Sequence, residues 1–359
     1  MKILYCSYSQ IPSNFANSIA VMQQCAALNA KADLLALLIH GEPYADVFQH
    51  YRVAPFPLIL LPKYSLKWNE LGLKLALLRY TWRWKPDVVY SRDVILNNWL
   101  CKFHVPNVYE IHQLDQDERR FDRYYKNQLR SITDSRYLKG IVCISDALRK
   151  ECMDFGIPEE KLTVLHSGVS VEYEDSAVAD VSMPRFEADK PIAMYVGSLQ
   201  KGKGIETILK MADISGQYNF LIIGGASGAI QVKKNLKHIP QVSNERARQY
   251  MRYADFLLLP MTKQKYKFHS PLKMFEYLSA GKVIIASQNT DLMEILQHGE
   301  NAMIAQEDNP RDFLSQMDRV CGDPSLRERL CHRAFQTARS HTWDIRAEAI
   351  CNLLKEKIS

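Results

Sequence analysis

Short apolar segments alternate with stretches of helical periodicity along nearly the whole chain, and this alternation constrains the fold more than any other feature. It is typical of βα units, in which strands are buried in a parallel sheet and helices cover its faces. The last stretch, about 310–358, has few helix breakers and is expected to be helical. The expected strands are 2–6, 33–39, 57–61, 87–90, 107–111, 140–144 and 162–165, then 192–197, 219–223, 255–259, 282–286 and 302–305.

An acidic stretch separates the two series of strands. Residues 172–190 are rich in Asp and Glu and contain Pro184, as a linker would. A chain of 359 residues also suits two domains, at ~150 residues per domain. We therefore predict an α/β protein of two doubly wound domains, at 1–175 and 186–338. In such domains, ligands bind in the crevice at the carboxyl ends of the strands.

The composition excludes several classes of protein. No uncharged apolar run approaches the ~18 residues that a membrane-spanning helix needs, and the first residues become polar too soon for a secretory signal. The eight cysteines include no C-x-x-C pair, which favours buried thiols in a reducing cytosol over metal or disulfide roles. The net charge of +6 permits an anionic ligand or membrane surface, and nothing indicates a nucleic-acid partner. We expect a cytoplasmic protein.

Two amphipathic segments each allow two interpretations. Segment 66–82 is either a core-packed helix with a solvated basic face or a helix on an anionic membrane surface. Its apolar residues recur at helical spacing, at Trp68, Leu71, Leu75, Leu78 and Trp82. Segment 119–139 is rich in Lys and Arg, and it is either a solvated helix face or a surface for lipid headgroups or sugar. Its aromatic residues are Phe121, Tyr124, Tyr125 and Tyr137.

The strongest local signal is the segment 270–281, Ser-Pro-Leu-Lys-Met-Phe-Glu-Tyr-Leu-Ser-Ala-Gly. Ser270 fits a helix N-cap, Pro271 the first helical position and Gly281 the residue just past the end. The free amides of that first turn make an anion site suited to a diphosphate, and Glu276 can accept hydrogen bonds from ribose hydroxyls. The alternative is a well-capped short helix with a surface Glu. The lysines close by in sequence are Lys263, Lys265, Lys267 and Lys273.

Two glycine-rich turns follow expected strands in the second half. The turn 197–204, Gly-Ser-Leu-Gln-Lys-Gly-Lys-Gly, combines close backbone approach with lysines that can neutralise phosphate. It has neither the Walker A ending nor the G-x-G-x-x-G spacing. The second turn, which contains Gly225, lies at the same expected edge, and a tight strand-to-helix turn is its alternative.

Taken in order, these segments resemble the glycosyltransferase family 4 group, the retaining sugar transferases of the GT-B fold. The resemblance covers most of the chain and rests on 13–22, 143–148, 156–169, 197–204, 254–260, 276–281 and 342–343. It implies two Rossmann-like domains facing a central cleft, the first for the acceptor and the second for a nucleotide-sugar donor. It also implies that 339–359 forms a helix crossing back to the first domain.

The resemblance implies a role for each matching residue. His112, Lys203 and Glu276 would be catalytic, with His112 beside the sugar, Lys203 on the donor diphosphate and Glu276 on the ribose. Asn14, Asn17 and Arg92, together with His112, would bind the acceptor; a surface ion pair of Arg92 with Asp93 is the alternative. The donor-binding set comprises Gly197, Ser198, Lys201, Lys203, Gly225, Ser270, Pro271, Leu272, Lys273 and Glu276.

The sequence departs from the family pattern at two positions. Ser198 stands where the family often has Arg, so one cationic phosphate contact is missing, and Phe268 stands where the family has a Glu near the transferred sugar. No metal or other cofactor is implied, because no H-x-x-H is present. Asp115 and Asp117 form a D-x-D triplet in the acceptor half, where a polar loop is expected.

The implied activity is transfer of a sugar from a nucleotide diphosphate sugar to a hydroxyl of a glycan or lipid-linked acceptor. Fixed cations and helix amides would stabilise the charge that develops on the leaving diphosphate. The expected setting is bacterial surface polysaccharide synthesis, such as capsule, O-antigen or lipopolysaccharide, with peripheral contact to the inner face of an anionic membrane. A nucleotide-sugar epimerase of similar fold and a non-catalytic sugar-nucleotide-binding partner are the alternatives.

Overall fold

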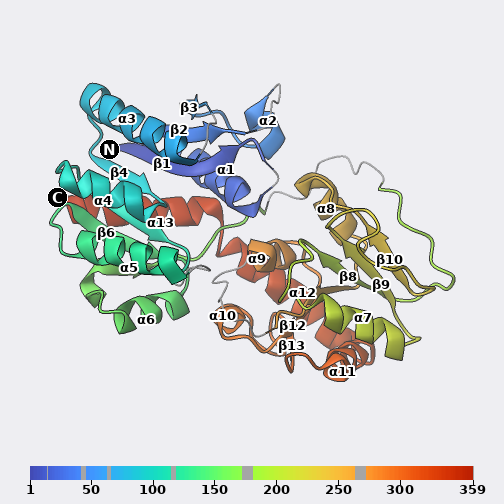
Figure 1. The fold of residues 1–359 in the computed structure, drawn as a ribbon. Helices are drawn as coiled ribbons and strands as arrows, with labels where there is room; N and C mark the ends of the chain where they lie inside the picture. Colours follow the sequence, from blue (N-terminus) through green and yellow to red (C-terminus); the bar gives the residue numbers. More distant parts are fainter. Residues whose placement is uncertain are drawn as a thin grey trace. The chain divides into compact units, whose positions relative to one another are not determined.

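The computed structural model describes residues 1–13, 15–41, 46–62, 66–114, 119–171, 181–262 and 272–358. Within these ranges, the side chains of 66–70, 119–121 and 290–291 are outside the description. The chain divides into two units (Figure 1). Unit 1 comprises Met1–Gly168 with Trp343–Ser359, and unit 2 comprises Val169–Lys265 with Ser270–Thr342.

Unit 1 is built on a parallel sheet in which the described strands have the order β3-β2-β1-β4-β5-β6-β7. The strands are β1 (Lys2–Ile11), β2 (Asp33–His40), β3 (Leu58–Leu61), β4 (Val88–Ser91), β5 (Asn107–Ile111), β6 (Leu138–Cys143) and β7 (Leu162–Val164). The helices are α1 (Ala16–Asn29), α2 (Val47–Tyr51), α3 (Leu66–Trp84), α4 (Val94–Lys102), α5 (Arg119–Thr133), α6 (Asp146–Asp154) and α13 (Trp343–Ile358), with a short 3₁₀ turn at Glu159–Lys161.

The first strand explains why the sheet of unit 1 needs helices on both faces. Ile3, Leu4, Tyr5 and Cys6 are successive residues, so their side chains alternate between the faces, and all four are fully buried. Strand β1 is longer than its apolar run predicts. Its register with β2 shifts between Cys6 and Gln10, and the strand continues to Ile11 through polar residues. This extension brings Ser7 and Ser9 to the edge where the candidate site lies.

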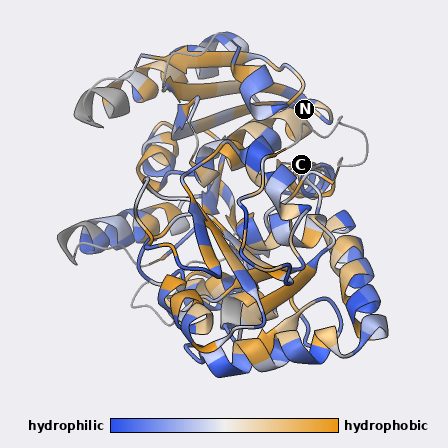
Figure 2. Ribbon diagram, turned by 90° about the vertical axis from the view of Figure 1, so that its right-hand side faces the viewer, coloured by the Kyte–Doolittle hydropathy of each residue, from blue (hydrophilic) through white to orange (hydrophobic). Residues whose placement is uncertain are grey.

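Unit 2 repeats the architecture with a parallel sheet of order β10-β9-β8-β11-β12-β13. Figure 2 shows the apolar colouring concentrated on the strands. The strands are β8 (Ile192–Val196), β9 (Asn219–Ile223), β10 (Leu236–Ile239), β11 (Phe256–Leu259), β12 (Val283–Ser287) and β13 (Met303–Ala305). The helices are α7 (Ile205–Ile214), α8 (Asn244–Met251), α9 (Leu272–Ser279), α10 (Thr290–Met293), α11 (Pro310–Cys321) and α12 (Pro324–Arg339).

The two doubly wound units confirm the predicted fold class, and each predicted strand segment overlaps a strand of the structure. Strand β10 was not predicted. It pairs only with β9 among the described strands and contains Lys237 and His238, so it lacks the continuous apolar run of a central strand.

The division between the units falls earlier than the acidic stretch. Val169 bridges to Thr342 and packs in the core of unit 2 together with Val181. Unit 2 therefore begins at Val169, whereas the sequence suggested a first domain ending at 175. Residues 172–180 of the acidic stretch lie outside the described residues. At the other end, α13 belongs to unit 1 and packs against α1.

Candidate functional site

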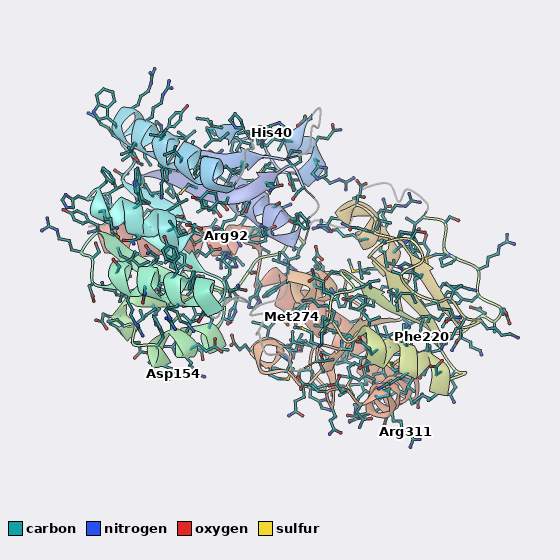
Figure 3. All side chains as sticks on the ribbon, in the orientation of Figure 1. His40, Arg92, Asp154, Phe220, Met274 and Arg311 are labelled. Carbon is teal, nitrogen blue, oxygen red and sulfur yellow. The ribbon has the colours of Figure 1, made fainter. Side chains whose placement is uncertain are left out.

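Unit 1 contains a pocket of about 350 Å³ at the carboxyl ends of its central strands. Such edges are where ligands bind in doubly wound sheets. The pocket is lined by residues of β1, by residues that follow β4 and β5, and by residues of α1, α4 and α5, among them Ser7, Ser9, Asn17, Arg92, His112 and Tyr124. Figure 3 labels Arg92, which directly follows β4. Three of the four predicted acceptor-binding residues thus line one pocket, and the fourth, Asn14, lies outside the described residues.

The imidazole of His112 is held on two sides. Its Nε2 lies 2.7 Å from Oε1 of Glu110, and its Nδ1 lies 3.2 Å from Nη2 of Arg92. Arg92 Nε–H is directed at the same Nε2, at 2.9 Å, and lies 3.4 Å from Glu110 Oε1. A carboxylate can only accept, whereas Arg92 Nε has Glu110 Oε1 as a second acceptor, so the charged carboxylate favours the proton on Nε2, and Nδ1 then accepts from Arg92. The neighbouring carboxylate thus favours the Nε2–H tautomer of His112.

Glu110 is a fully charged partner for this histidine despite its burial in β5. Burial by itself favours the neutral acid, but the Arg346 guanidinium, the hydrogen bond from His112 and the Arg92 guanidinium together hold the pKa of Glu110 well below its ordinary value. Tyr90 OH donates to Glu110 Oε2 at 2.5 Å. Sequence reasoning did not identify Glu110 as a site residue. The signal was a single charge inside an otherwise uncharged strand.

The charge state of His112 follows from the same surroundings. Burial, and then the positive charge of Arg92, lower the pKa of His112 from 6.5 to about 4, while Glu110 acts in the opposite direction. The imidazole is therefore neutral at pH 7. It presents an uncharged ring to the pocket, with about a third of its side chain open to solvent.

The structure excludes the alternative role of Arg92 as a surface partner of Asp93. Arg92 donates to the backbone oxygen of Asn17 at 3.3 Å and pairs with Glu110. The side chain of Asp93 instead caps α4 by accepting from the backbone N–H of Leu96. The guanidinium of Arg92 thus orders the wall of the pocket.

The aromatic residues of segment 119–139 do not share one role. Tyr125 is buried, and its hydroxyl lies 2.5 Å from that of Tyr109. Tyr137 stacks on His104, with ring centres 4.8 Å apart. Tyr124 is exposed at the pocket, and the side chain of Phe121 lies outside the described residues. Among the aromatic residues of this segment whose side chains are described, Tyr124 is exposed at the pocket, whereas Tyr125 lines the pocket as a buried residue and Tyr137 packs on His104.

In unit 2, the predicted glycine-rich turn follows β8 and lies against a partly buried lysine. Gly197 has φ +145°, and a Cβ on it would lie 2.4 Å from Nζ of Lys273. That Nζ lies 3.7 Å from the centre of the Tyr195 ring, whose hydroxyl donates to the Ser198 carbonyl. Glycine is favoured here because side-chain-bearing residues rarely adopt this φ, and a Cβ would also displace the end of Lys273, from the first turn of α9. Tyr195 was not predicted as a site residue.

Lys203 and Glu276, the predicted catalytic residues of unit 2, both affect the pKa of Lys273. Burial, and then the charge of Lys203, hold the pKa of Lys273 well below its ordinary value, while Glu276 acts in the opposite direction. Burial also lowers the pKa of Lys203, which precedes the α7 N-cap Gly204. Two desolvated ammonium groups of like charge form a site that an anion would stabilise.

The remaining predicted donor residues surround this cluster or lie outside the description. Ser198 and Lys201 are exposed in the turn, and a Cβ on Gly225 would lie 2.5 Å from Cδ1 of Leu199. Leu272 opens α9. Ser270, Pro271 and Phe268, the lysines at 263, 265 and 267, and the triplet 115–117 lie outside the described residues. In the described part of the chain, no group of three or more His, Cys, Asp or Glu side chains is arranged to hold a metal ion.

Each half of the chain matches the model of a glycosyltransferase family. Residues 20–173 match Glycosyltransferase Family 4, and residues 182–337 match Glycosyl transferases group 1. An uncharacterized glycosyltransferase of Methanocaldococcus jannaschii is 24% identical over 344 residues, covering 85% of this chain and 84% of its own. An alpha-1,3-N-acetylgalactosaminyltransferase of Campylobacter jejuni, named for N,N'-diacetylbacillosaminyl-diphospho-undecaprenol, is 20% identical and covers 64% of each chain.

Solved structures share the fold. HepE of Anabaena, in complex with UDP, superposes with a TM-score of 0.76 at 15% identity, covering 99% of this chain and 100% of its own. The apo lipopolysaccharide outer core galactosyltransferase WaaB gives a TM-score of 0.67 at 15% identity, covering 99% and 100%. With both halves matched and the two doubly wound units in place, the chain belongs to the family 4 glycosyltransferases of the GT-B fold.

Proposed function

We propose that this enzyme is a retaining glycosyltransferase that moves a sugar from a nucleotide diphosphate sugar to a hydroxyl of a glycan or lipid-linked acceptor. The observation that carries the proposal is the pair Lys203 and Lys273 near the Gly197 turn, since both lysines are partly buried and both have a lowered pKa. A diphosphate bound there would place negative charge beside both lysines. As the bond to the anomeric carbon breaks, the leaving diphosphate gains charge, and fixed cations stabilise it most at that point.

Retention follows from attack on the face from which the diphosphate leaves. The acceptor oxygen forms a bond to the anomeric carbon, the carbon–oxygen bond to the diphosphate breaks, and a diphosphate oxygen takes the acceptor proton. The carboxylate of Asp93, which lines the unit 1 pocket, is engaged in capping α4. The neutral imidazole of His112, whose two nitrogens contact Glu110 and Arg92, would border the sugar without adding charge. No metal takes part in the proposed reaction.

The proposed donor is a UDP-sugar, and the proposed acceptor is a lipid-linked glycan of a bacterial surface polysaccharide. Support for the donor comes from HepE, which was solved in complex with UDP and with UDP-glucose. Support for the acceptor comes from the Campylobacter transferase and from WaaB, whose names refer to a diphospho-undecaprenol glycan and to lipopolysaccharide. Tyr124 at the rim of the unit 1 pocket would offer its ring to an acceptor sugar.

The proposed enzyme works at the surface of an anionic membrane through α3. Leu73 and Leu77 of this helix are fully buried, whereas the opposite face exposes large apolar side chains, with exposed fractions of 44% at Leu71, 57% at Leu75, 36% at Leu78 and 83% at Trp82. Arg79 and Arg83 are exposed beside this stripe, which suits anionic headgroups around an apolar contact. No helix in the described part of the chain is long and apolar enough to span a bilayer.

The donor site is tested with a thermal-shift panel of UDP-, GDP- and dTDP-sugars on the wild type, Lys203→Ala and Glu276→Ala. A ligand at ~100 times its Kd adds ~2.7 kcal/mol, so stabilisation by one nucleotide class should be plain and should disappear in both variants. Product analysis with the stabilising donor then separates transfer from epimerisation, which needs no acceptor. Stabilisation that survives in both variants would refute the donor site, and binding without turnover would favour a non-catalytic partner.

Membrane contact is tested by flotation with neutral and anionic lipid vesicles. We expect binding to anionic vesicles only, and a loss of most of it in the double variant Leu75→Ser/Trp82→Ser. Ile214→Ser is the matched control, because Ile214 is 52% exposed but lies in unit 2. Light scattering that shows a dimer in the wild type and a monomer in the double variant would instead assign the stripe to a second copy of the chain.

A further inference from the structure

Arg346 is a buried arginine of α13, and it is the residue through which the end of the chain reaches the histidine pocket of unit 1. Its side chain is 4% exposed. In α13 it lies on the inward face with Trp343, Ala347 and Ile350, all buried. An arginine at a core position is costly unless its donors are all engaged. The contacts of Arg346 therefore indicate what it is for.

Every nitrogen of the Arg346 guanidinium has a partner. Nε donates to Oε1 of Gln24 at 2.9 Å, and Nη2 donates to Oε2 of Glu110 at 2.9 Å. Nη1 donates to the backbone oxygens of Leu165 and His166, the second at 2.6 Å. Gln24 also donates from Nε2 to Glu110 Oε2 at 3.1 Å. The guanidinium thus connects α1, β5 and the segment after β7.

Glu110 divides its two oxygens between the core and the pocket. Oε2 accepts from Arg346, Gln24 and Tyr90, while Oε1 accepts from His112 and faces Arg92. With three donors on one oxygen, the carboxylate has little freedom to rotate. Its other oxygen, Oε1, is consequently held where it can accept the Nε2 proton of His112.

We propose that Arg346 is a positioning residue for the glycosyl-transfer site: acting through Glu110, it fixes the tautomer and orientation of His112 and the placement of Arg92, so that the pocket is complete only when α13 is docked. Arg346 lines no part of the pocket that the structure describes and acts entirely through its neighbours. The catalytic consequence rests on the proposed role of His112 at the transferred sugar.

The charges around His112 make the proposal measurable. The described groups that act on it are Glu110, which raises its pKa, and Arg92 and Arg346, which lower it. The other titratable groups close to Arg92 and Glu110 are Tyr5, Cys25 and Tyr90, and burial raises the pKa of each well above its ordinary value, so they are uncharged at neutral pH. The balance between Glu110 and the two arginines therefore sets the titration of His112.

The experiment follows the ten histidines of the full chain by long-range ¹H–¹⁵N spectra without substrate, as the pH falls from 8 to 4. In the wild type we expect the Nε2–H tautomer of His112 and a pKa of about 4. Arg346→Met should raise the pKa of His112 by about one pH unit or more, because a positive charge is removed and Glu110 is left less neutralised. Glu110→Gln should act in the opposite direction, so that His112 stays neutral throughout the range.

Three controls keep the result decisive. Arg346→Lys retains the charge and should return the titration of His112 most of the way to that of the wild type. The signals of His104, which is stacked on Tyr137 in the same unit, should be the same in every variant. If Arg346→Met fails to fold, Glu110→Gln and the double variant Arg346→Met/Glu110→Gln, which removes both buried charges, still give the comparison. The double variant should titrate between the two single variants.

The proposal would be overturned if Arg346→Met and Glu110→Gln shifted the pKa of His112 in the same direction. An Nδ1–H tautomer of His112 in the wild type would also overturn it. Because no substrate is present, this result does not depend on sugar transfer. Suppose the two single variants shift the pKa of His112 in opposite directions, but the enzyme transfers no sugar to any acceptor. The positioning role of Arg346 would then stand, and only the proposed function would be contradicted.

Discussion

Nζ of Lys273 lies 3.7 Å from the centre of the Tyr195 ring, beside the Gly197 turn. The face of an aromatic ring attracts a cation, and such contacts are worth about 2 kcal/mol where both groups are desolvated. This attraction does not compensate fully for burial and the nearby charge of Lys203, so the pKa of Lys273 stays low. Binding of a diphosphate would raise it. A bound anion would therefore favour the charged form of Lys273.

The first prediction concerns this proton. We expect UDP binding to be accompanied by proton uptake, since the bound diphosphate favours the charged forms of Lys273 and Lys203. The affinity should fall as the pH rises from 7 to 9. Titration calorimetry in two buffers of different ionisation enthalpy measures the number of protons. Lys273→Met should reduce that number and flatten the pH dependence, and equal uptake in both proteins would contradict the assignment.

The second prediction concerns the glycine beside this lysine. Gly197→Ala places a Cβ 2.4 Å from Lys273 Nζ at φ +145°, so the lysine must move and the turn is strained. We expect UDP affinity to fall at least tenfold, measured by calorimetry. Gly216→Ala is the matched control, because a Cβ there meets nothing within 4 Å. Equal affinities of the two variants would show that the position of Lys273 does not matter.

The third prediction concerns stability in acid. The folded-state pKa of His112, about 4, lies below its ordinary 6.5, so between these values the unfolded chain binds a proton that the folded chain does not. The free energy of unfolding should therefore decrease as the pH falls from 6.5 to 4.5. The contribution is about 1–2 kcal/mol once screening of the partly open side chain is included.

Urea unfolding at pH 7 and pH 4.5 measures this contribution. His112→Gln keeps an N–H for Glu110 but cannot titrate, and it should lose less stability over the same interval than the wild type. Glu110 titrates below this window because its pKa is lowered, so it does not obscure the comparison. An identical loss in both proteins would contradict the lowered pKa of His112.

The fourth prediction concerns the departure from the family pattern at Ser198. The side chain is exposed in the donor turn, where Ser198→Arg would restore a cation to the phosphates. We expect UDP affinity to rise about fivefold. This is the gain from one charge-assisted hydrogen bond after the entropic cost of ordering the arginine side chain is subtracted. Gln200→Arg adds the same charge to the same turn and should have a smaller effect. An equal gain in UDP affinity in both variants would show that added positive charge anywhere in the turn is sufficient and that position 198 has no special role.

The fifth prediction concerns metal ions. The two lysines supply the positive charge for the leaving diphosphate in the proposed reaction, so transfer should proceed unchanged in EDTA. The rate of product formation with and without added Mg²⁺ measures this directly. Activity that disappears in EDTA and returns with Mg²⁺ would contradict a metal-free reaction.

Much of the fold was predictable because parallel strands buried on both faces leave continuous apolar runs in the sequence. The run Ile3–Cys6 is such a case, with every residue fully buried. The pattern fails where a strand is not buried in this way. Strand β10 at the edge of unit 2 contains Lys237 and His238, and the polar continuation of β1 beyond Cys6 resembles a loop in sequence.

The site was predictable in part for a similar reason. His112 and Arg92 follow apolar strands, and parallel strands bring their carboxyl ends to one edge, so both could be assigned to one pocket. Their partners could not be assigned. The hydrogen bond between Glu110 and Arg346 joins residues 236 positions apart, and no local pattern relates them. The only hints were an acidic residue in a buried strand and an arginine on the apolar face of a helix.

Unit 1 is built from two stretches of the chain, one before and one after unit 2, and this has a consequence for synthesis on the ribosome. Unit 2 is complete once Thr342 has emerged, whereas unit 1 must wait for the segment from Trp343 onward, which is translated later. Until then, Glu110 has no Arg346, and the nascent unit 1 carries an ion pair with one member missing. The first half of the enzyme to be made is therefore the second to be completed, and a chain that stops before α13 lacks the arginine that pairs with Glu110.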